Sequence, residues 1–201
     1  MDLEVENIQN FWQKYFGDCP PVSYLFKYHL NDRWFRVHSL PESKRYAENE
    51  IEVAELLKRQ NLLLADLTGN DSDCFLICGN YSESPLEDNL KQCSALANFN
   101  FQKFVRLCKQ DFNPDELEPN EEPVYLSLFF APYKFKEQDL DEVLLCVAEE
   151  KIVNLFVVNF EHQRIFAPYD GGVDVVLANS AERDKFKSNY KSWLSNHPSG
   201  F

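Results

Sequence analysis

The sequence predicts an α+β protein with a largely antiparallel sheet and helices packed on one face. Three observations lead to this class. Of the 201 residues, 44% are hydrophobic and 14% aromatic, enough to form a folded core. Apolar segments of strand length alternate with amphipathic helical segments. The connections between the predicted strands of the last third are short, which favours antiparallel neighbours.

The first half of the chain is expected to contain helices and strands in alternation. Residues 3–16 carry apolar side chains at spacings of three and four, typical of an amphipathic helix. Residues 22–30 and 33–38 are rich in aromatic and β-branched residues around an Asn-Asp pair, which predicts a hairpin. A second helix is expected over residues 48–67, and residues 74–78 are expected to form a buried strand.

Residues 79–110 carry conflicting patterns. The segment from Leu90 to Cys108 suits one helix, yet Phe99, Phe101, Val105 and Leu107 also alternate as in strands, and both alternatives stay open. The last third predicts a β-α-β-β-β-α unit, whose final helix begins with Asn179 and Glu182 in the positions of a capping box. The five segments before that helix are residues 123–131, 137–150, 152–160, 164–167 and 173–178.

An acidic, proline-bearing stretch marks the best candidate for a domain boundary. It covers residues 111–122 and separates an N-terminal α+β portion, residues 1–110, from a C-terminal sheet with two helices, residues 123–201. The alternative is that both portions form one continuous domain.

The acidic charge is concentrated in one window. The net charge is −13, and residues 111–150 hold 12 acids against 2 bases, a net of −10. An acidic surface attracts a basic protein partner and speeds its association, whereas the simpler alternative is a solvated face. The candidate partner-binding residues are Asp115, Glu116, Glu118, Glu121, Glu122, Asp139, Asp141 and Glu142.

The composition also bears on compartment and on the classes of partner. The N-terminus lacks the pattern of a signal peptide, and no apolar run reaches the length of a membrane span, so a cytoplasmic protein with no membrane contact is expected. The excess of acids makes nucleic acid an unfavourable partner. In a reducing compartment the six cysteines are expected to be buried structural thiols rather than disulfides.

Donors suited to an anion gather between residues 33 and 46. A strand over residues 33–38 would place Trp34, Arg36 and His38 on one face, and a loop with further donors follows. The alternative is that Arg36 and His38 are structural and pair with carboxylates of the same chain. The anion-binding candidates are Arg36, His38, Ser39, Ser43, Lys44 and Arg45.

A second distinctive segment lies near residue 170. Asp170-Gly171-Gly172 is typical of a turn in which glycines supply positive φ and the aspartate caps local amides. Asp170 and Asp174 could instead form a metal or acid–base pair, but no neighbouring histidine or glutamate completes a ligand set. The structural turn, Tyr169, Asp170, Gly171, Gly172 and Asp174, is therefore the preferred interpretation, and no metal site is predicted.

These two segments resemble a family of bacterial proteins described only as a domain of unknown function. The family pairs an R-W-x-R-x-H-S-L-P-x-S-K-R-Y segment, matched by Arg33 to Tyr46, with a Y-D-G-G-x-D-V block, matched by Tyr169 to Val175. A W-L-S ending is matched by Trp193 to Ser195. The resemblance implies a bacterial, cytosolic origin and no known activity, cofactor or catalytic residue. By analogy, small acidic bacterial proteins of this kind often neutralise toxins.

Two functional hypotheses follow. The first is a non-enzymatic acidic binding protein, such as an immunity protein or antitoxin that neutralises a basic partner. The second is an enzyme or ligand-binding domain for an anionic small molecule, with His38 as general acid or base and Arg36, Lys44 and Arg45 as clamps. The sequence lacks a phosphate loop, a G-x-S-x-G elbow and an H-E-x-x-H motif, so no cofactor is predicted. A regulatory module without a tight partner is a third interpretation that sequence does not separate.

Overall fold

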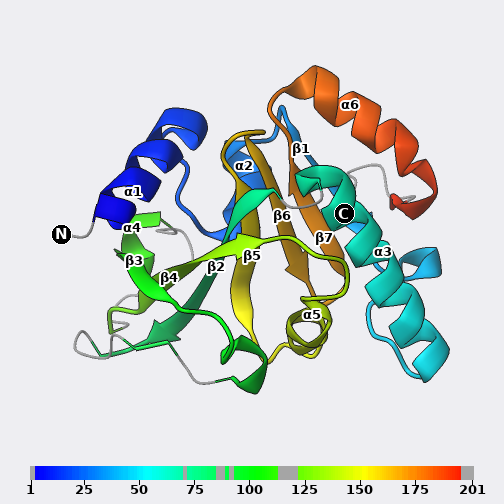
Figure 1. Ribbon diagram of the computed structural model, residues 1–201, viewed down its shortest axis with the longest axis horizontal. Helices are drawn as coiled ribbons and strands as arrows, with labels where there is room; N and C mark the ends of the chain where they lie inside the picture. The colour runs from blue at the N-terminus through cyan, green and yellow to red at the C-terminus, as the bar shows by residue number, and fades with distance from the viewer. Residues whose placement is uncertain (1–2, 70–71, 85–88, 91–92, 113–121, 196–201) are drawn as a thin grey trace.

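The computed structural model describes residues 3–69, 72–84, 89–90, 93–112 and 122–195. Within these residues, seven strands form one sheet in the order β1-β7-β6-β5-β2-β4-β3, and every neighbouring pair is antiparallel. The α+β class with an antiparallel sheet is confirmed (Figure 1). The strands are β1 (Trp34–His38), β2 (Asp73–Ser82), β3 (Gln102–Cys108), β4 (Tyr125–Lys134), β5 (Val153–Asn159), β6 (Arg164–Tyr169) and β7 (Gly172–Val176).

The sheet combines strands from both sides of residues 111–122. The β1 strand pairs with β7, and β2 lies between β4 and β5, so the order in space interleaves the two parts of the chain. Residues 111–122 therefore lie in the chain between strand β3 and strand β4, which are hydrogen-bonded neighbours in the same sheet.

Helices cover both faces of the sheet, so the expectation of helices on one face was wrong. Alternate residues of β2 enter different clusters: Cys74, Leu76 and Cys78 pack with residues of α3 (Glu50–Thr68) and α5 (Asp141–Ala148). Ile77 packs on the opposite side with α1 (Leu3–Phe16). Most central strand residues are buried whichever way they point, so strict polar–apolar alternation is missing.

The α1 helix covers one face with aromatic contacts. Trp12 lies between Phe16, Phe26 and Phe156, with ring centroids 4.7 to 6.0 Å apart. Its indole nitrogen donates a hydrogen bond of 2.7 Å to the main-chain oxygen of Cys19. This bond satisfies the one polar atom of a buried tryptophan and fixes the chain where it leaves α1.

The predicted strand over residues 22–30 is wrong. This segment forms a 3-10 turn, Ser23–Leu25, followed by α2 (Phe26–His29). Val22, Leu25 and Phe26 are buried, and their spacing of three and four matches a helical turn rather than a strand. The predicted hairpin therefore does not form, and β1 takes its partner, β7, from the end of the chain.

The remaining elements follow the predicted pattern with shifted ends. The helix expected at 48–67 is α3, and its N-cap Asn49 accepts a hydrogen bond from the Glu52 amide. The expected β-α-β-β-β-α unit is β4-α5-β5-β6-β7-α6, with α6 at Ser180–Asn189. In the ambiguous segment the strand alternative holds for β3, and short α4 (Lys109–Phe112) follows it. Among the described residues, no helix combines the length and apolarity that a bilayer-spanning segment requires.

The capping box at α6 forms only in half. Asn179 accepts a hydrogen bond from the Glu182 amide, as expected, with a length of 3.0 Å. The Glu182 carboxylate binds Arg164 of β6 at 3.3 Å instead of returning to the N-cap amide. This ion pair ties the start of α6 to the sheet.

Candidate functional site

The two distinctive segments of the sequence come together through the pairing of β1 with β7. In this register Arg36 lies opposite Asp174, Val37 opposite Val173 and His38 opposite Gly172. The β6–β7 turn at Asp170 and Gly171 lies beside the residues that follow β1, because the Ser39 amide donates to the Gly171 oxygen at 3.1 Å. We call residues 33–46 and 169–175 together the motif junction.

A buried ion pair holds the centre of the motif junction. The Arg36 guanidinium donates two hydrogen bonds to Asp174, of 2.6 and 2.9 Å, and lies 4.4 Å from the centre of the Tyr169 ring. Burial disfavours the charge on Arg36, but the hydrogen bonds with Asp174 outweigh it and raise the arginine pKa. Burial also raises the pKa of the Asp174 carboxyl, and the arginine offsets only part of that effect. Arg36 is thus occupied by a carboxylate of its own chain.

The two glycines of the turn are needed for close approach, which corrects the prediction that they supply positive φ. Neither has a φ in the left-handed region. A Cβ at Gly172 would overlap the main-chain oxygen of Val37, with the His38 Cα at 3.1 Å. A Cβ at Gly171 would meet only side chains, the nearest being the Tyr169 ring at 3.0 Å. Gly172 therefore lets β7 approach β1 closely enough to pair.

Arg45 and Tyr46 surround the Asp170 carboxylate. Arg45 Nε donates to Asp170 Oδ2, and the Tyr46 hydroxyl lies 3.0 Å both from that oxygen and from Glu150 Oε1. Burial disfavours ionisation of Asp170, but the hydrogen bonds from Arg45 and Tyr46 outweigh it and lower its pKa. The carboxylates of Glu150 and Asp170 raise the pKa of Tyr46 to about 12.

These side chains border a cavity of about 330 Å³ between α3 and α5. Its walls combine apolar groups with more carboxylates than bases, so the cavity suits a cationic group with an apolar stem better than an anion. The lining residues are Arg45, Tyr46, Ala47, Val53, Leu56, Leu145, Ala148, Glu149, Glu150 and Asp170.

Of the other anion-binding candidates, Lys44 and Ser39 have partners within the chain, and Ser43 is exposed to solvent. Lys44 Nζ lies 2.8 Å from Glu52 and 2.9 Å from Glu48, and these carboxylates raise its pKa. Ser39 is buried, and its hydroxyl accepts a hydrogen bond of 2.8 Å from Gln60. Ser43 is exposed with a φ of 59° in the loop after β1. The cations predicted to clamp an anion are therefore each bound to carboxylates.

His38 is buried without a carboxylate partner. Its side chain bonds to the backbone of Gly171, and its Nε2 has no hydrogen-bond partner within the described part of the chain. Burial lowers the histidine pKa below its usual 6.5, and the nearby positive charge of Arg36 lowers it further. Only 9% of the residue is exposed, so a substrate has little access to the ring. The geometry supports a structural role better than general acid–base catalysis.

This histidine gives a pH-dependent expectation. Because its pKa is lower in the folded than in the unfolded protein, the unfolded state binds a proton more readily below pH 6.5. The contribution of His38 to the free energy of unfolding should be complete above pH 6.5. It should be lost as the pH falls from 6.5 through the pKa of the histidine in the folded protein. Urea denaturation at pH 7.5 and 5.5 measures this loss. The loss should be smaller in His38→Gln, and an equal loss in both proteins would contradict the assignment.

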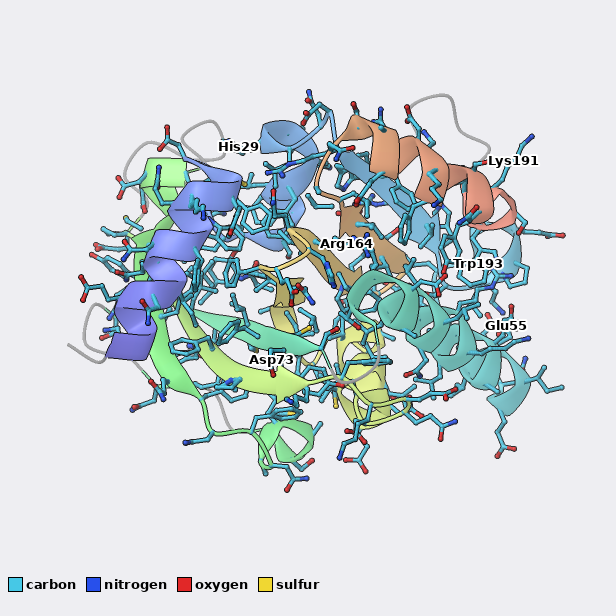
Figure 2. The ribbon with its side chains drawn as sticks, turned by 45° about the horizontal axis from the view of Figure 1, so that its top comes forward. His29, Glu55, Asp73, Arg164, Lys191 and Trp193 are labelled. Atoms are coloured by element: carbon cyan, nitrogen blue, oxygen red, sulfur yellow. The ribbon has the colours of Figure 1, made fainter. Side chains whose placement is uncertain are left out.

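The third segment of the resemblance reaches the same region from the end of the chain. Arg59 of α3 donates to the main-chain oxygen of His38 at 3.3 Å, pairs with Glu55 at 2.6 Å, and lies 5.1 Å from the centre of the Trp193 ring. Figure 2 shows Trp193 beside α3, near Glu55. Glu55 and Arg59 lie four residues apart on this helix, one turn from each other. Arg59 thus joins α3, the end of β1 and the C-terminal segment.

The structure describes only part of the predicted acidic contact. Asp115, Glu116, Glu118 and Glu121 lie outside the described residues. Asp139 and Glu142 are exposed beside and on α5, and Glu122 is exposed before β4. Asp141 is half-buried and accepts a hydrogen bond of 2.6 Å from Asn61 of α3. Asp141 therefore connects two helices, which leaves Asp139, just before α5, and Glu142, on α5, as the surface members.

Three side chains of this region were not among the predicted site residues. Arg59 and Gln60 stand within a helix whose apolar pattern drew attention to the core, and Glu150 lies more than 100 residues from Tyr46. A polar glutamine on the inward side of α3 was the one available signal, because a buried amide needs a partner. Within the described residues, no group of three or more histidine, cysteine, aspartate or glutamate side chains could hold a metal ion.

Fold and site together define an α+β protein whose distinctive segments bind one another. A family model described as "Domain of unknown function (DUF3885)" matches residues 22–198, and the chain belongs to this family. The match includes all three segments that meet around β1, β7 and α3. Comparisons with curated proteins and with solved structures found no significant match.

Proposed function

We propose that this protein is a non-enzymatic acidic binding protein whose partner is a basic protein. The observation that carries the proposal is the grouping of exposed carboxylates around α5 and the start of α3. We define the α3–α5 acidic face by its exposed acids, Glu48, Glu50, Glu137, Asp139, Glu142, Glu149 and Glu150. Glu48, Glu149 and Glu150 of this face also pair with Lys44, Lys151 and Arg45.

Three contacts connect the two helices of this face or the residues directly beside them. Asn61 of α3 donates to Asp141 of α5 at 2.6 Å, and the amide of Gln138 donates to Asn61 at 3.1 Å. At the other end of α5, Tyr46 reaches Glu150 at 3.0 Å. The carboxylates therefore come from elements that are fixed relative to one another, which favours binding because little order is lost when a partner arrives.

Apolar and aromatic groups accompany these charges. Tyr46 is 47% exposed at the cavity between α3 and α5, and Ile51 is 83% exposed beside Glu50 in the first turn of α3. Tyrosine is enriched among residues that dominate binding energy, and its two rotatable bonds make it cheap to immobilise. In the cavity, the charged group of a lysine or arginine from a basic partner would contact carboxylates, and its apolar stem would pack against the apolar lining.

The alternative function, an enzyme or ligand-binding domain for an anion, has weaker support. An anion at Arg36 would have to displace Asp174, which accepts two hydrogen bonds from the guanidinium, and at Lys44 it would have to displace Glu48 and Glu52. Each exchange replaces an existing charge pair by another, so little free energy is gained. His38, the proposed acid or base, is buried.

The proposal extends to a cytoplasmic, bacterial protein of the immunity or antitoxin type. The six cysteines are free thiols, which suits a reducing compartment. A high density of carboxylates on one face suits neutralisation of a basic active site, because complementary potentials speed association.

Reversal of charge on the acidic face tests the proposal. The triple variant Glu137→Lys, Asp139→Lys, Glu142→Lys should lose at least about tenfold in affinity for a basic partner, mostly through slower association. The partner is first recovered from extract of the source cell by the wild-type protein, then purified. Its affinity for each variant is measured by surface plasmon resonance at several salt concentrations.

A matched variant changes the same charge on the other face of the sheet. Glu6, Asp18 and Asp32 are exposed near α1 and α2, and their triple replacement by lysine should reduce the affinity less than twofold. Equal losses in both triple variants would show that only net charge matters. Affinity independent of salt and of both replacements would contradict the proposal outright.

A further inference from the structure

Two cysteines far apart in sequence lie next to each other in the fold. Cys93 precedes the 3-10 turn Ser94–Leu96, and Cys146 lies on α5, 53 residues further along the chain. Their sulfur atoms are 3.8 Å apart, with the Cys93 thiol donating to the Cys146 sulfur. A disulfide needs an S–S distance of about 2.05 Å, so an approach of about 1.8 Å separates the two thiols from a bond.

We propose that Cys93 and Cys146 form a reversible disulfide when a peroxide oxidises the protein. This inference concerns a part of the molecule separate from the acidic contact with a partner and does not depend on it. It names a modification site, the substrate class being a small hydroperoxide such as hydrogen peroxide.

Cys93 is placed to react first. It is half-buried and lines two neighbouring cavities, of about 310 and 790 Å³, so a small oxidant can reach it. Lys151 lines the smaller cavity, and its ammonium group acts on both sulfur atoms electrostatically. Reactive cysteines are found in partly exposed surroundings of this kind, near a positive charge.

Cys146 is suited to the second step. Burial raises the pKa of its thiol, with Lys151 opposing this effect, and the first step consumes only the Cys93 thiol. It then lies within reach as the resolving thiol. The second cysteine does not need to be ionised in advance, because the sulfenic acid that it attacks is a strong electrophile.

The chemistry balances with hydrogen peroxide as the oxidant. The Cys93 sulfur attacks one peroxide oxygen, and the O–O bond breaks. Cys93 becomes a sulfenic acid, and the other oxygen departs as the first water molecule. The Cys146 sulfur attacks the Cys93 sulfur, the S–S bond forms, and the S–O bond breaks. The leaving hydroxide takes the Cys146 proton as a second water. Two thiols are oxidised and one peroxide is reduced, and a dithiol reverses the bond by exchange.

The other cysteines lack this arrangement. Cys19, Cys74 and Cys78 are buried, and burial raises their pKa values to about 12, 11 and 12. Cys108 is half-buried, and its thiol donates to Gln110 at 2.9 Å. Cys108 therefore has the exposure of the proposed pair without a neighbouring sulfur, which makes it the matched control.

The bond would join the segment Cys93–Phe101 to α5. Cys93, Phe99, Phe101 and Cys146 are only partly buried at the margin of the core on this side of the sheet. A covalent link at this margin closes a loop of 53 residues, which reduces the entropy of the unfolded chain.

Peptide mapping of the full chain tests the proposal. The reduced protein is freed of reductant, exposed to hydrogen peroxide in the folded state, alkylated and digested with trypsin without reduction. Mass spectrometry should detect peptide 92–103 linked to peptide 137–151, each of which contains a single cysteine. Free thiols should fall from six to four per chain, and dithiothreitol should restore them. The midpoint of thermal unfolding should rise by about 5–10 °C in the oxidised protein.

Three variants complete the test. Cys93→Ser and Cys146→Ser should each abolish the linked peptide and the peroxide-induced rise in the unfolding midpoint. Cys108→Ser should retain both. The proposal is overturned if the wild-type protein gives no such linked peptide, if Cys93 pairs equally with Cys78, or if the linkage appears only after denaturation.

Discussion

Replacement of Gly172 by alanine is expected to destabilise the protein by at least about 3 kcal/mol. The added Cβ would overlap the main-chain oxygen of Val37, and its other neighbours are the Tyr169 hydroxyl at 3.0 Å and the His38 Cα at 3.1 Å. Backbone of a paired strand cannot rotate away as a side chain can. Relief requires that β7 separate from β1, which would remove the register that opposes Arg36 to Asp174.

Gly171→Ala is the matched control for this prediction. Its Cβ would meet the Tyr169 ring at 3.0 Å and Arg45 Cγ at 3.4 Å. Both atoms belong to side chains, and the Arg45 side chain is largely exposed, so a cost of about 1 kcal/mol or less is expected. Urea denaturation of both variants, followed by circular dichroism, gives the comparison. Equal losses of stability would show that close approach is not the reason for glycine at position 172.

Breaking the ion pair of Arg36 with Asp174 is expected to cost about 3–5 kcal/mol. In Asp174→Leu the guanidinium keeps its charge, but the side chain is 17% exposed and loses both carboxylate bonds. A charge that loses its carboxylate in such surroundings is costly, because the Trp34 and Tyr169 rings that remain beside it do not replace two charged hydrogen bonds. Arg36→Met should cost a similar amount, since it leaves a carboxylate that is 5% exposed.

The double variant Arg36→Met, Asp174→Leu should recover most of that loss. Removal of both charges leaves apolar groups in a largely buried place, an exchange that is often neutral in stability. A double-mutant cycle from urea denaturation measures the coupling, which should be at least about 2 kcal/mol. Additive losses would mean that the two residues act independently. Single variants as stable as the wild type would mean that water screens the pair.

The elements were predictable where local periodicity agreed with burial. The helix α3 and the strands β5 to β7 follow their apolar patterns closely. The strand predicted at residues 22–30 was wrong because aromatic residues favour strands on average, whereas here burial at helical spacing decided the conformation. The helices on both faces could not be foreseen from alternation, because strands buried on both sides carry no alternating pattern.

The candidate site was predictable as a set of segments and not as a set of contacts. Arg36 and Asp174 were both singled out, yet nothing in the sequence shows that these two residues, 138 positions apart, form one ion pair. The structural alternative for Arg36, pairing with a carboxylate of the same chain, describes the contact that forms. For His38 that alternative does not describe the contact, because its ring bonds to the backbone of Gly171.

The pairing of β1 with β7 also has a consequence for synthesis of the chain. A ribosome that adds about 5–20 residues per second needs about 7–28 s to advance the 138 positions from Arg36 to Asp174. During this interval β1 lacks its partner strand, since among the described residues its one neighbour in the sheet is β7. Folding of the sheet is therefore expected to finish only after almost the whole chain has been translated, and a nascent chain that ends before Gly172 should remain a substrate for chaperones.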